Sequence, residues 1–255
     1  MAEPSLRELL DVATEAAYLA GRRTLSYFNA GVAVEIKADN SPVTRADREA
    51  EDLIRAQIAK YFPTHGIIGE EHAPKEGDKS HRWIIDPIDG TKTFIHGVPF
   101  YGVLIGVEVH GKPSVGAVYL PAVDEMLCAA LGEGCWWNGR RAKVSSCSSL
   151  KDAVLLVTDV KSAQKKSPAF EKLSEQTKFT RTWGDCYGYV LAATGRAEIM
   201  IDPHMNPWDC SPFPPIFAEA GGHFSDWSGK NTIWGPDAIG CNAALKAQAL
   251  AILKS

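Results

Sequence analysis

The chain has 255 residues, 45% hydrophobic and 23% charged, a balance that is ordinary for a globular protein and argues against disorder. Its net charge of −4 gives no support for a nucleic-acid partner, because such partners usually require a basic surplus. We expect no secretory signal, because the first residues lack a basic segment followed by an apolar one, and no apolar run reaches the roughly 18 residues that a membrane span needs. The six cysteines are scattered without a C-x-x-C pair. We therefore expect a cytoplasmic protein with free thiols, not a zinc site or a disulfide framework.

Two amphipathic helices are predicted at the start of the chain. Ser5 and Glu8 form a capping box, and small or aliphatic residues then recur at helical spacing as far as Ala20. A second helix should begin after Thr44, with Asp47 three residues on, and end before Pro63. Its buried stripe is expected to contain Ala46, Ala50, Leu53, Ile54 and Ile58.

The pattern changes to short strands from Gly66. GIIGEE, WIIDPI and EMLCAALGEGCWWNG are β-rich runs, and residues 101–121 predict a hairpin turned at residues 110–112. After Ser146, strands are expected in AVLLVTD and AEIMID, and helices in PAFEKLSEQTK, DCYGYVLAATG and SPFPPIFAEAGG. The fold class is α/β (mixed α+β) in layers, with subdomains at residues 1–146 and 147–255.

Acidic residues stand at the ends of several apolar segments. Glu70 and Glu71 end GIIGEE, and Asp86 and Asp89 end WIIDPID. Asp47 of TRAD and Asp209 of NPWDCSP add two more carboxylates, without compensating Lys or Arg nearby. Carboxylates at buried strand ends are costly unless a cation neutralises them. Mg²⁺ prefers such oxygen ligands, so the pattern predicts a magnesium site.

The residues after Asp89 indicate what the metal is for. The carbonyl of Ile88 lies between the two aspartates, and Gly90 allows backbone N–H groups to approach an anion. Thr91 offers a hydroxyl beside a metal-bound water. Metal, anion cradle and water-orienting hydroxyl together favour phosphate-ester hydrolysis.

These motifs resemble those of the inositol monophosphatase superfamily. The resemblance rests on EE at 70–71, DPIDGT at 86–91 and WD at 208–209 followed by a helix ending in AGG, and it covers nearly the whole chain. The fold that it implies is a layered α-β-α-β-α sandwich of the inositol monophosphatase and fructose bisphosphatase type. The activity that it implies is that of a Mg²⁺-dependent phosphomonoesterase with two to three ions per active site.

The resemblance also implies residue roles. One ion would be held by Glu70, Asp86 and the Ile88 carbonyl, and a second by Asp86, Asp89 and Asp209. Most metal ligands would then lie in the first subdomain, and the last ligand and the substrate pocket in the second.

The remaining implied roles concern phosphate and water. Backbone N–H groups of Gly90 and Thr91 would bind phosphate. Thr91, hydrogen-bonded to Asp47, would help Glu70 to orient and deprotonate the attacking water.

Some of these residues also have plainer interpretations. Asp47 could simply bond back to Thr44 at the helix start, and Asp209 could cap the helix that follows it. The tryptophans at 136 and 137 are expected in the core rather than at a substrate platform.

Asp185 carries the substrate hypothesis. The stretch GDCYGY, together with NPWDCSPFPPIFAEAGG, resembles the histidinol-phosphate phosphatase branch. The inositol-phosphate branch typically has GSAA at the position where this chain has GDCY. A carboxylate suits the ammonium and imidazole groups of L-histidinol phosphate, although Asp185 could instead cap its helix. Thr93 stands where Asn is commoner in that branch, which puts substrate fit in doubt.

We therefore predict that the protein is a histidinol-phosphate phosphatase of histidine biosynthesis. We expect it to be a dimer, as is usual in the family. The alternatives are an inositol-1-phosphate or broader small-metabolite phosphatase, and a non-catalytic phosphometabolite- or partner-binding protein on the same fold.

Overall fold

The computed structural model describes residues 3–255. The helices are α1 (Leu6–Leu25), α2 (Arg45–Tyr61), α3 (Thr91–Ile95), α4 (Val160–Lys166), α5 (Ala169–Gln176), α6 (Asp185–Ala193), α7 (Pro207–Cys210), α8 (Phe213–Ala220) and α9 (Lys246–Leu253), with a 3-10 turn at Leu150–Asp152. No helix among these described residues is both long and apolar enough to cross a membrane.

A seven-stranded sheet forms the larger part of the framework, in the order β3-β4-β5-β6-β7-β8-β9. Its strands are β3 (His65–Gly69), β4 (Asp78–Asp89), β5 (Gly102–Val109), β6 (Lys112–Leu120), β7 (Glu125–Ala130), β8 (Gly134–Trp137) and β9 (Arg140–Arg141). The pair β3 and β4 is parallel, and the other neighbours are antiparallel.

A five-stranded sheet of order β11-β10-β12-β14-β13 follows along the chain. It consists of β10 (Val154–Val157), β11 (Phe179–Arg181), β12 (Ile199–Asp202), β13 (Gly222–Ser225) and β14 (Ala238–Asn242). A small hairpin of β1 (Val34–Ile36) and β2 (Pro42–Thr44) precedes α2.

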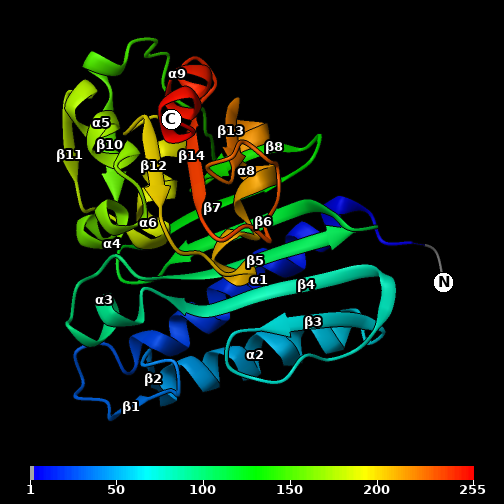
Figure 1. Ribbon diagram of the computed structural model, residues 1–255. Coiled ribbons are helices and arrows are strands. Elements are labelled where there is room, and N and C mark those ends of the chain that lie inside the picture. The colour runs from blue at the N-terminus through cyan, green and yellow to red at the C-terminus, as the bar shows by residue number, and fades with distance from the viewer. Residues whose placement is uncertain (1–2) are drawn as a thin grey trace.

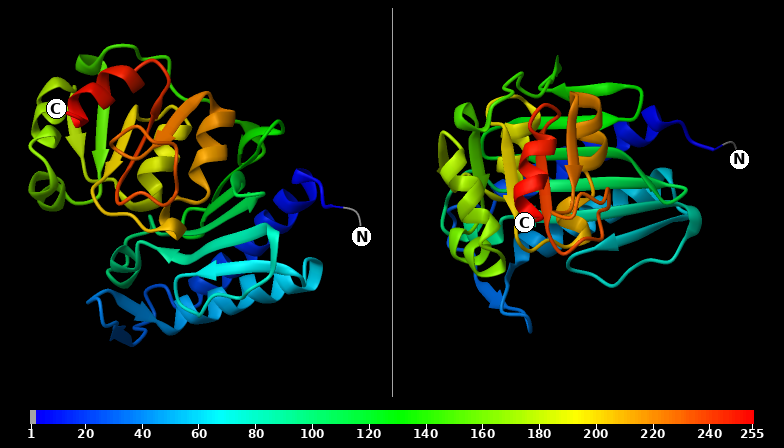
Figure 2. Two further views of the ribbon diagram at one scale, coloured as in Figure 1. Left: turned by 45° about the vertical axis from the view of Figure 1, so that its right-hand side comes forward. Right: turned by 45° about the horizontal axis from the view of Figure 1, so that its top comes forward.

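The layers stack in the predicted order. Helices α1 and α2 pack on one face of the large sheet, and α6 and α8 lie between the two sheets. Helices α4, α5 and α9 contribute side chains to the core on the outer side of the small sheet. Figures 1 and 2 show this sequence of layers from blue α1 and α2 to red α9. The α-β-α-β-α expectation is confirmed.

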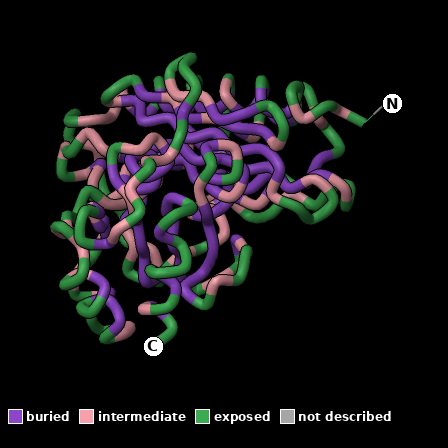
Figure 3. Tube along the Cα trace, turned by 90° about the horizontal axis from the view of Figure 1, so that it is seen from above, coloured by how far each residue is buried: buried purple, intermediate pink, exposed green. Residues whose placement is uncertain are grey.

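Strand β5 shows why the sequence produces a layered core. All its residues except Val109 are buried, with Val103 and Ile105 facing the α1–α2 layer and Leu104 facing the α6–α8 layer. A strand that is covered on both faces has a nearly continuous run of apolar residues in its sequence. Buried chain is accordingly concentrated in the central strands, with exposed chain around them (Figure 3).

Two predicted capping boxes are present, at Ser5 with Glu8 and at Thr44 with Asp47. The predicted buried stripe of α2 was wrong at one residue, because Leu53 is 41% exposed. Glu51 lies on the buried face of this helix, although it was not predicted there. The hairpin turns at residues 110–111 as expected.

Two further details differ from expectation. The tryptophans at 136 and 137 are half-buried at the end of β8, not in the core. The helix predicted from Ser211 begins at Phe213, after the separate short helix α7.

The two halves of the chain share one apolar core. Residues from β4 to β8 and from α6, α8 and β12 belong to the same cluster. Gly116 of β6 lies so close to the second half that a Cβ there would overlap the carbonyl of Pro212. A division of the chain near residue 146 stays a prediction.

Candidate active site

Two aspartates stand where β4 ends. The register between β4 and β5 shifts between Asp86 and Asp89, and Pro87 inside this shift has no N–H to donate. The chain can therefore turn, and the N–H of Ile88 donates to Asp86 Oδ1 at 3.0 Å. Bulges of this kind often redirect side chains next to active sites. Asp86 is buried and Asp89 is half-buried.

Asp209 joins this pair from α7. A capping box holds it, and the N–H of Asn206 donates to Asp209 Oδ2 at 2.7 Å. Ser211 donates to a backbone carbonyl of β4 at 3.0 Å and so fixes α7 against that strand. Carboxylate oxygens of Asp86, Asp89 and Asp209 all lie within 4.8 Å of one another. Asp209 therefore caps its helix and also faces the aspartate cluster.

Glu70 follows β3, the strand next to β4. Its Oε1 accepts a hydrogen bond from Lys37 Nζ at 2.7 Å, and Glu71 Oε1 accepts another at the same distance. Lys37 lies on the segment between β1 and β2, so this hairpin reaches over the end of β3. The side chain of Glu71 is only 4% exposed.

Glu51 of α2 positions the Glu70–Glu71 segment, and sequence reasoning did not single it out. Its carboxylate accepts the N–H of Glu71 at 2.8 Å and of His72 at 3.2 Å, and it pairs with Arg55 at 2.7 Å. A Cβ on Gly69 would overlap that carboxylate, which explains the glycine before the two glutamates. The spacing from Asp47 to Glu51, i and i+4 on one helix face, was the available signal.

The cluster is electrostatically strained without a cation. Burial raises the pKa of Asp86 well above its ordinary value, and the nearby Glu70, Asp89 and Asp209 raise it further. Burial likewise raises the pKa of Asp209 to about 6. Like charges held this close favour protonation unless a cation intervenes. A donor set made of carboxylate oxygens fits a hard divalent ion such as Mg²⁺.

Thr91 and Asp47 are brought together beside this cluster. Thr91 Oγ1 lies 3.3 Å from Asp47 Oδ1 and 3.1 Å from the carbonyl of Ile88, and its single hydroxyl hydrogen has these two acceptors. Asp47 Oδ2 also accepts from the backbone and the hydroxyl of Thr44, at 2.8 and 2.6 Å. Asp47 thus serves the helix start and reaches Thr91, so its two interpretations hold together.

Asp185 does not cap its helix. Gly184 is the N-cap, and Asp185 has a φ of +50°, which non-glycine residues rarely adopt. Its carboxylate accepts from Thr93 Oγ1 at 2.6 Å and lies against Gly90, where a Cβ would come within 2.8 Å of it. The next N–H, of Cys186, donates to Asp89. Asp185 therefore faces the turn after the aspartate pair.

A cavity of about 210 Å³ opens beside the cluster. Its lining contains Asp89 and Asp209 of the cluster, together with polar and apolar neighbours and three further aspartates, Asp159, Asp185 and Asp202. A larger cavity of about 530 Å³ lies elsewhere and contains none of the predicted site residues. We take the smaller one as the candidate substrate pocket because it adjoins the carboxylates.

Two of these pocket residues were missed at the sequence level. Asp159 follows the strand VLLV, and Asp202 ends the strand IMID, so the acid-at-strand-end pattern used for Asp86 would also have found them. Burial raises the pKa of Asp202 to about 8 even though its carboxylate accepts the N–H of Thr158 at 3.2 Å. Aspartates are therefore the commonest residues in the lining of this pocket.

A site of this kind, with oxygen ligands for a divalent ion and an adjoining pocket, defines a metal-dependent hydrolase. The model of the inositol monophosphatase family matches residues 5–255, and the chain belongs to that family. It is thus a metal-dependent phosphatase acting on small phosphorylated substrates, as the sequence motifs predicted.

Individual relatives agree with this assignment. A histidinol-phosphatase of Chlorobaculum parvum is 42% identical over 88% of this chain and 88% of its own length. An inositol-1-monophosphatase of Mesorhizobium japonicum is 33% identical over 87% of this chain and 86% of its own. The crystal structure of the extragenic suppressor protein suhB from Bartonella henselae superposes with a TM-score of 0.90 at 29% identity, covering 97% of this chain and 99% of that one.

Proposed function

We propose that this phosphatase hydrolyses L-histidinol phosphate to L-histidinol and phosphate, with Mg²⁺ as its cofactor, in histidine biosynthesis. The observation that carries the proposal is the acidic pocket next to the aspartate cluster, where Asp159, Asp185 and Asp202 surround the space for the leaving group. L-Histidinol carries an ammonium group and an imidazole, and both pair well with carboxylates. The identity to a histidinol-phosphatase over most of the chain supports the same substrate.

The residues present fit two Mg²⁺ ions. We assign Glu70, Asp86 and the Ile88 carbonyl to one ion, and Asp86, Asp89 and Asp209 to the other, with a third, weaker ion near Glu70. Bound Mg²⁺ supplies charge neutralisation for the phosphate and an acidified water. Lys37 Nζ lies 2.7 Å from Glu70 Oε1, so we assign the other carboxylate oxygen of Glu70 to the ion.

Thr91 and Glu70 are assigned to the attacking water. The Thr91 hydroxyl hydrogen is used on Asp47 or on the Ile88 carbonyl, so its oxygen is left as an acceptor for a water proton. Glu70, whose pKa burial raises, is suited to take that proton. Backbone N–H groups of Gly90 and Thr91 are assigned to the phosphate oxygens.

Asp185 is assigned to the cationic leaving group. Thr93 and the φ of +50° hold its carboxylate at the edge of the pocket, within reach of a group attached to the phosphate. The pocket carboxylates repel an anionic leaving group and gain little from a neutral polyol. Inositol 1-phosphate, the substrate class named for other relatives, is the second candidate.

The test compares kcat/KM for L-histidinol phosphate and inositol 1-phosphate in the presence of Mg²⁺, for the unmodified enzyme and for Asp185→Asn. We expect a preference of about 100-fold for histidinol phosphate, roughly 2.7 kcal/mol of differential transition-state binding, that falls at least about tenfold in the variant. Asp152→Asn, at an exposed carboxylate of the 3-10 turn, is the control. Equal rates on both substrates would overturn the substrate assignment and leave the phosphatase class intact.

We also propose that the enzyme is cytoplasmic, that it forms a homodimer, and that it has no nucleic-acid or membrane partner. Light scattering of the purified enzyme at micromolar concentration tests the dimer, and a monomeric mass would refute it.

A further inference from the structure

A second polar cavity, of about 640 Å³, lies at the opposite end of β4 from the aspartate cluster. Glu3, Asp78, Ser80, His81 and His110 are among its lining residues. His81 precedes Asp86 by five strand residues, or roughly 16 Å at the usual rise of a strand. The cavity is therefore separate from the site described above.

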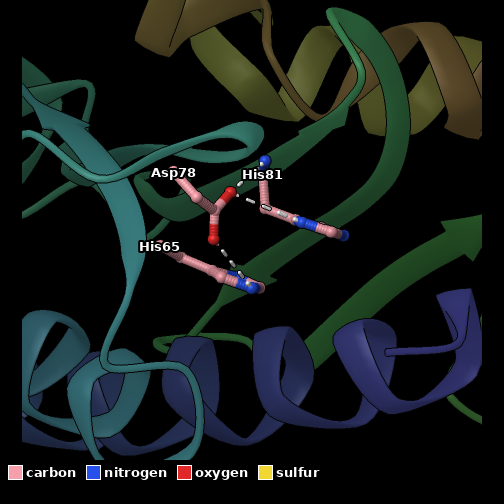
Figure 4. A group of neighbouring side chains, drawn as sticks. All are labelled: His65, Asp78 and His81. Atoms are coloured by element: carbon pink, nitrogen blue, oxygen red, sulfur yellow. Dashed lines mark hydrogen bonds and ion pairs between the residues drawn. The ribbon is translucent and has the colours of Figure 1, made fainter. Parts of the chain in front are cut away.

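His65, Asp78 and His81 gather at this cavity in a way that resembles a metal centre (Figure 4). The hydrogen bonds exclude His65 as a ligand. The indole N–H of Trp83 donates to His65 Nδ1 at 3.1 Å, so the His65 ring carries no proton on that nitrogen. Its single proton must then lie on Nε2, which faces Asp78 Oδ2 at 3.9 Å and has no free lone pair.

His81 has the opposite arrangement. Ser80 Oγ donates to Asp78 Oδ1 at 2.8 Å, so it accepts from the Nδ1–H of His81 at 3.0 Å. Because Nδ1 donates in this relay, Nε2 is the ring nitrogen of His81 that can offer a lone pair. That nitrogen is buried and has no hydrogen-bond partner among residues 3–255. Metal-binding histidines are usually held in this way, with the other ring nitrogen donating to an outer partner.

Glu3 links the free nitrogen of His81 to a further candidate ligand, His110. Glu3 Oε1 lies 3.7 Å from His81 Nε2 and 2.8 Å from His110 Nε2. The rings of His81 and His110 are inclined by 50° with centroids 6.2 Å apart, so they are not stacked against each other. His110 is exposed at the turn between β5 and β6, and its Nε2 contacts Glu3, so closing on an ion requires a rotation of its side chain toward His81.

We propose that His81 Nε2, His110 Nε2 and the Glu3 carboxylate bind a divalent transition-metal ion of the Zn²⁺ class. Two imidazoles and one carboxylate with an open fourth position suit Zn²⁺ and do not suit Mg²⁺. When the ion binds, the His110 ring proton moves from Nε2 to Nδ1 by exchange with solvent, which frees the Nε2 lone pair. The ion fastens the segment before α1 to β4 and to the β5–β6 turn. The expectation of no zinc site rested on the cysteines, whereas these ligands come from three separate segments.

The test uses Co²⁺ as a spectroscopic substitute for Zn²⁺, with untagged full-length enzyme and excess Mg²⁺. A four-coordinate site with histidine ligands gives intense visible absorption, whereas six-coordinate oxygen ligation at the aspartate cluster gives weak bands. We expect intense bands that saturate at one Co²⁺ per chain and disappear when Zn²⁺ is added. Glu3→Gln and His110→Ala, both at exposed side chains, should weaken Co²⁺ binding about tenfold or more.

Two controls separate this site from other ligands. Asp209→Asn, in the aspartate cluster, and His96→Ala, at an exposed histidine elsewhere, should both keep the intense bands. Absence of intense bands in the unmodified enzyme, or bands that persist unchanged in both Glu3→Gln and His110→Ala, would overturn the proposal. Neither result bears on the phosphatase activity.

Discussion

Glu51 offers a sharp test of how the fold positions the metal site. Its side chain is completely buried, and it accepts two backbone N–H groups from the segment that carries Glu70 while pairing with Arg55. Glu51→Gln keeps the volume but removes the charge and turns one acceptor into a donor. Breaking a buried ion pair costs about 3–5 kcal/mol. Because Arg55 keeps a bond to the carbonyl of His72, we expect a loss near the lower end, about 3 kcal/mol.

The assay for this prediction is urea unfolding followed by tryptophan fluorescence, together with the Mg²⁺ dependence of turnover. Glu51→Gln should lower the unfolding midpoint and raise the Mg²⁺ concentration for half-maximal rate about tenfold or more, because Glu70 is no longer held in place. Asp52→Asn, the same chemical change at a 69% exposed side chain of α2, is the matched control. If Glu51→Gln unfolds and responds to Mg²⁺ as the control does, the positioning role is refuted.

Three further predictions follow from single contacts. Thr91→Val should lower kcat about 100-fold with little change in melting temperature, and Thr91→Ser should restore it; equal kcat in all three would contradict a role for the hydroxyl. Gly116→Ala should destabilise the enzyme by about 2 kcal/mol or more in urea unfolding, since the new methyl group overlaps Pro212; an unchanged midpoint would show that the layers can separate freely. Burial lowers the pKa of His223 to about 4. Between about pH 6.5 and 4 the unfolded chain therefore binds a proton at this ring and the folded chain does not. The free energy of unfolding should fall as the pH drops through this range. Urea unfolding at pH 7 and at pH 5 should show a smaller fall in the free energy of unfolding for His223→Gln than for the unmodified enzyme. An identical fall in the variant would contradict the role of His223.

Local patterns predicted much of the fold and of the aspartate cluster. The capping box at Thr44 and Asp47 involves neighbours three residues apart, so it is visible in the sequence. Asp86 and Asp89 follow one another at the end of an apolar strand. Because both belong to the same strand end, the prediction that they bind a cation did not depend on where this strand lies in the fold. The layered architecture followed from the family resemblance, and the superposition on related structures confirms it.

Other features depend on contacts between distant segments. Glu51 reads as a surface residue of α2 until the Glu70 segment is placed over it. Asp185 adopts a left-handed backbone that local propensity disfavours, and only its bonds to Thr93 and Thr158 across the layers hold it there. Glu3, His81 and His110 come from three segments of the chain, so no spacing pattern could have joined them.

The central claim is that the carboxylates at the ends of β3 and β4 and on α7 hold the catalytic ions. Anomalous diffraction from crystals soaked in Mn²⁺, a substitute for Mg²⁺ with the same preference for oxygen ligands, tests this directly. We expect two anomalous peaks that share Asp86, one toward Glu70 and the other toward Asp89 and Asp209. Crystals that bind Mn²⁺ elsewhere, with no peak among these carboxylates, would contradict it.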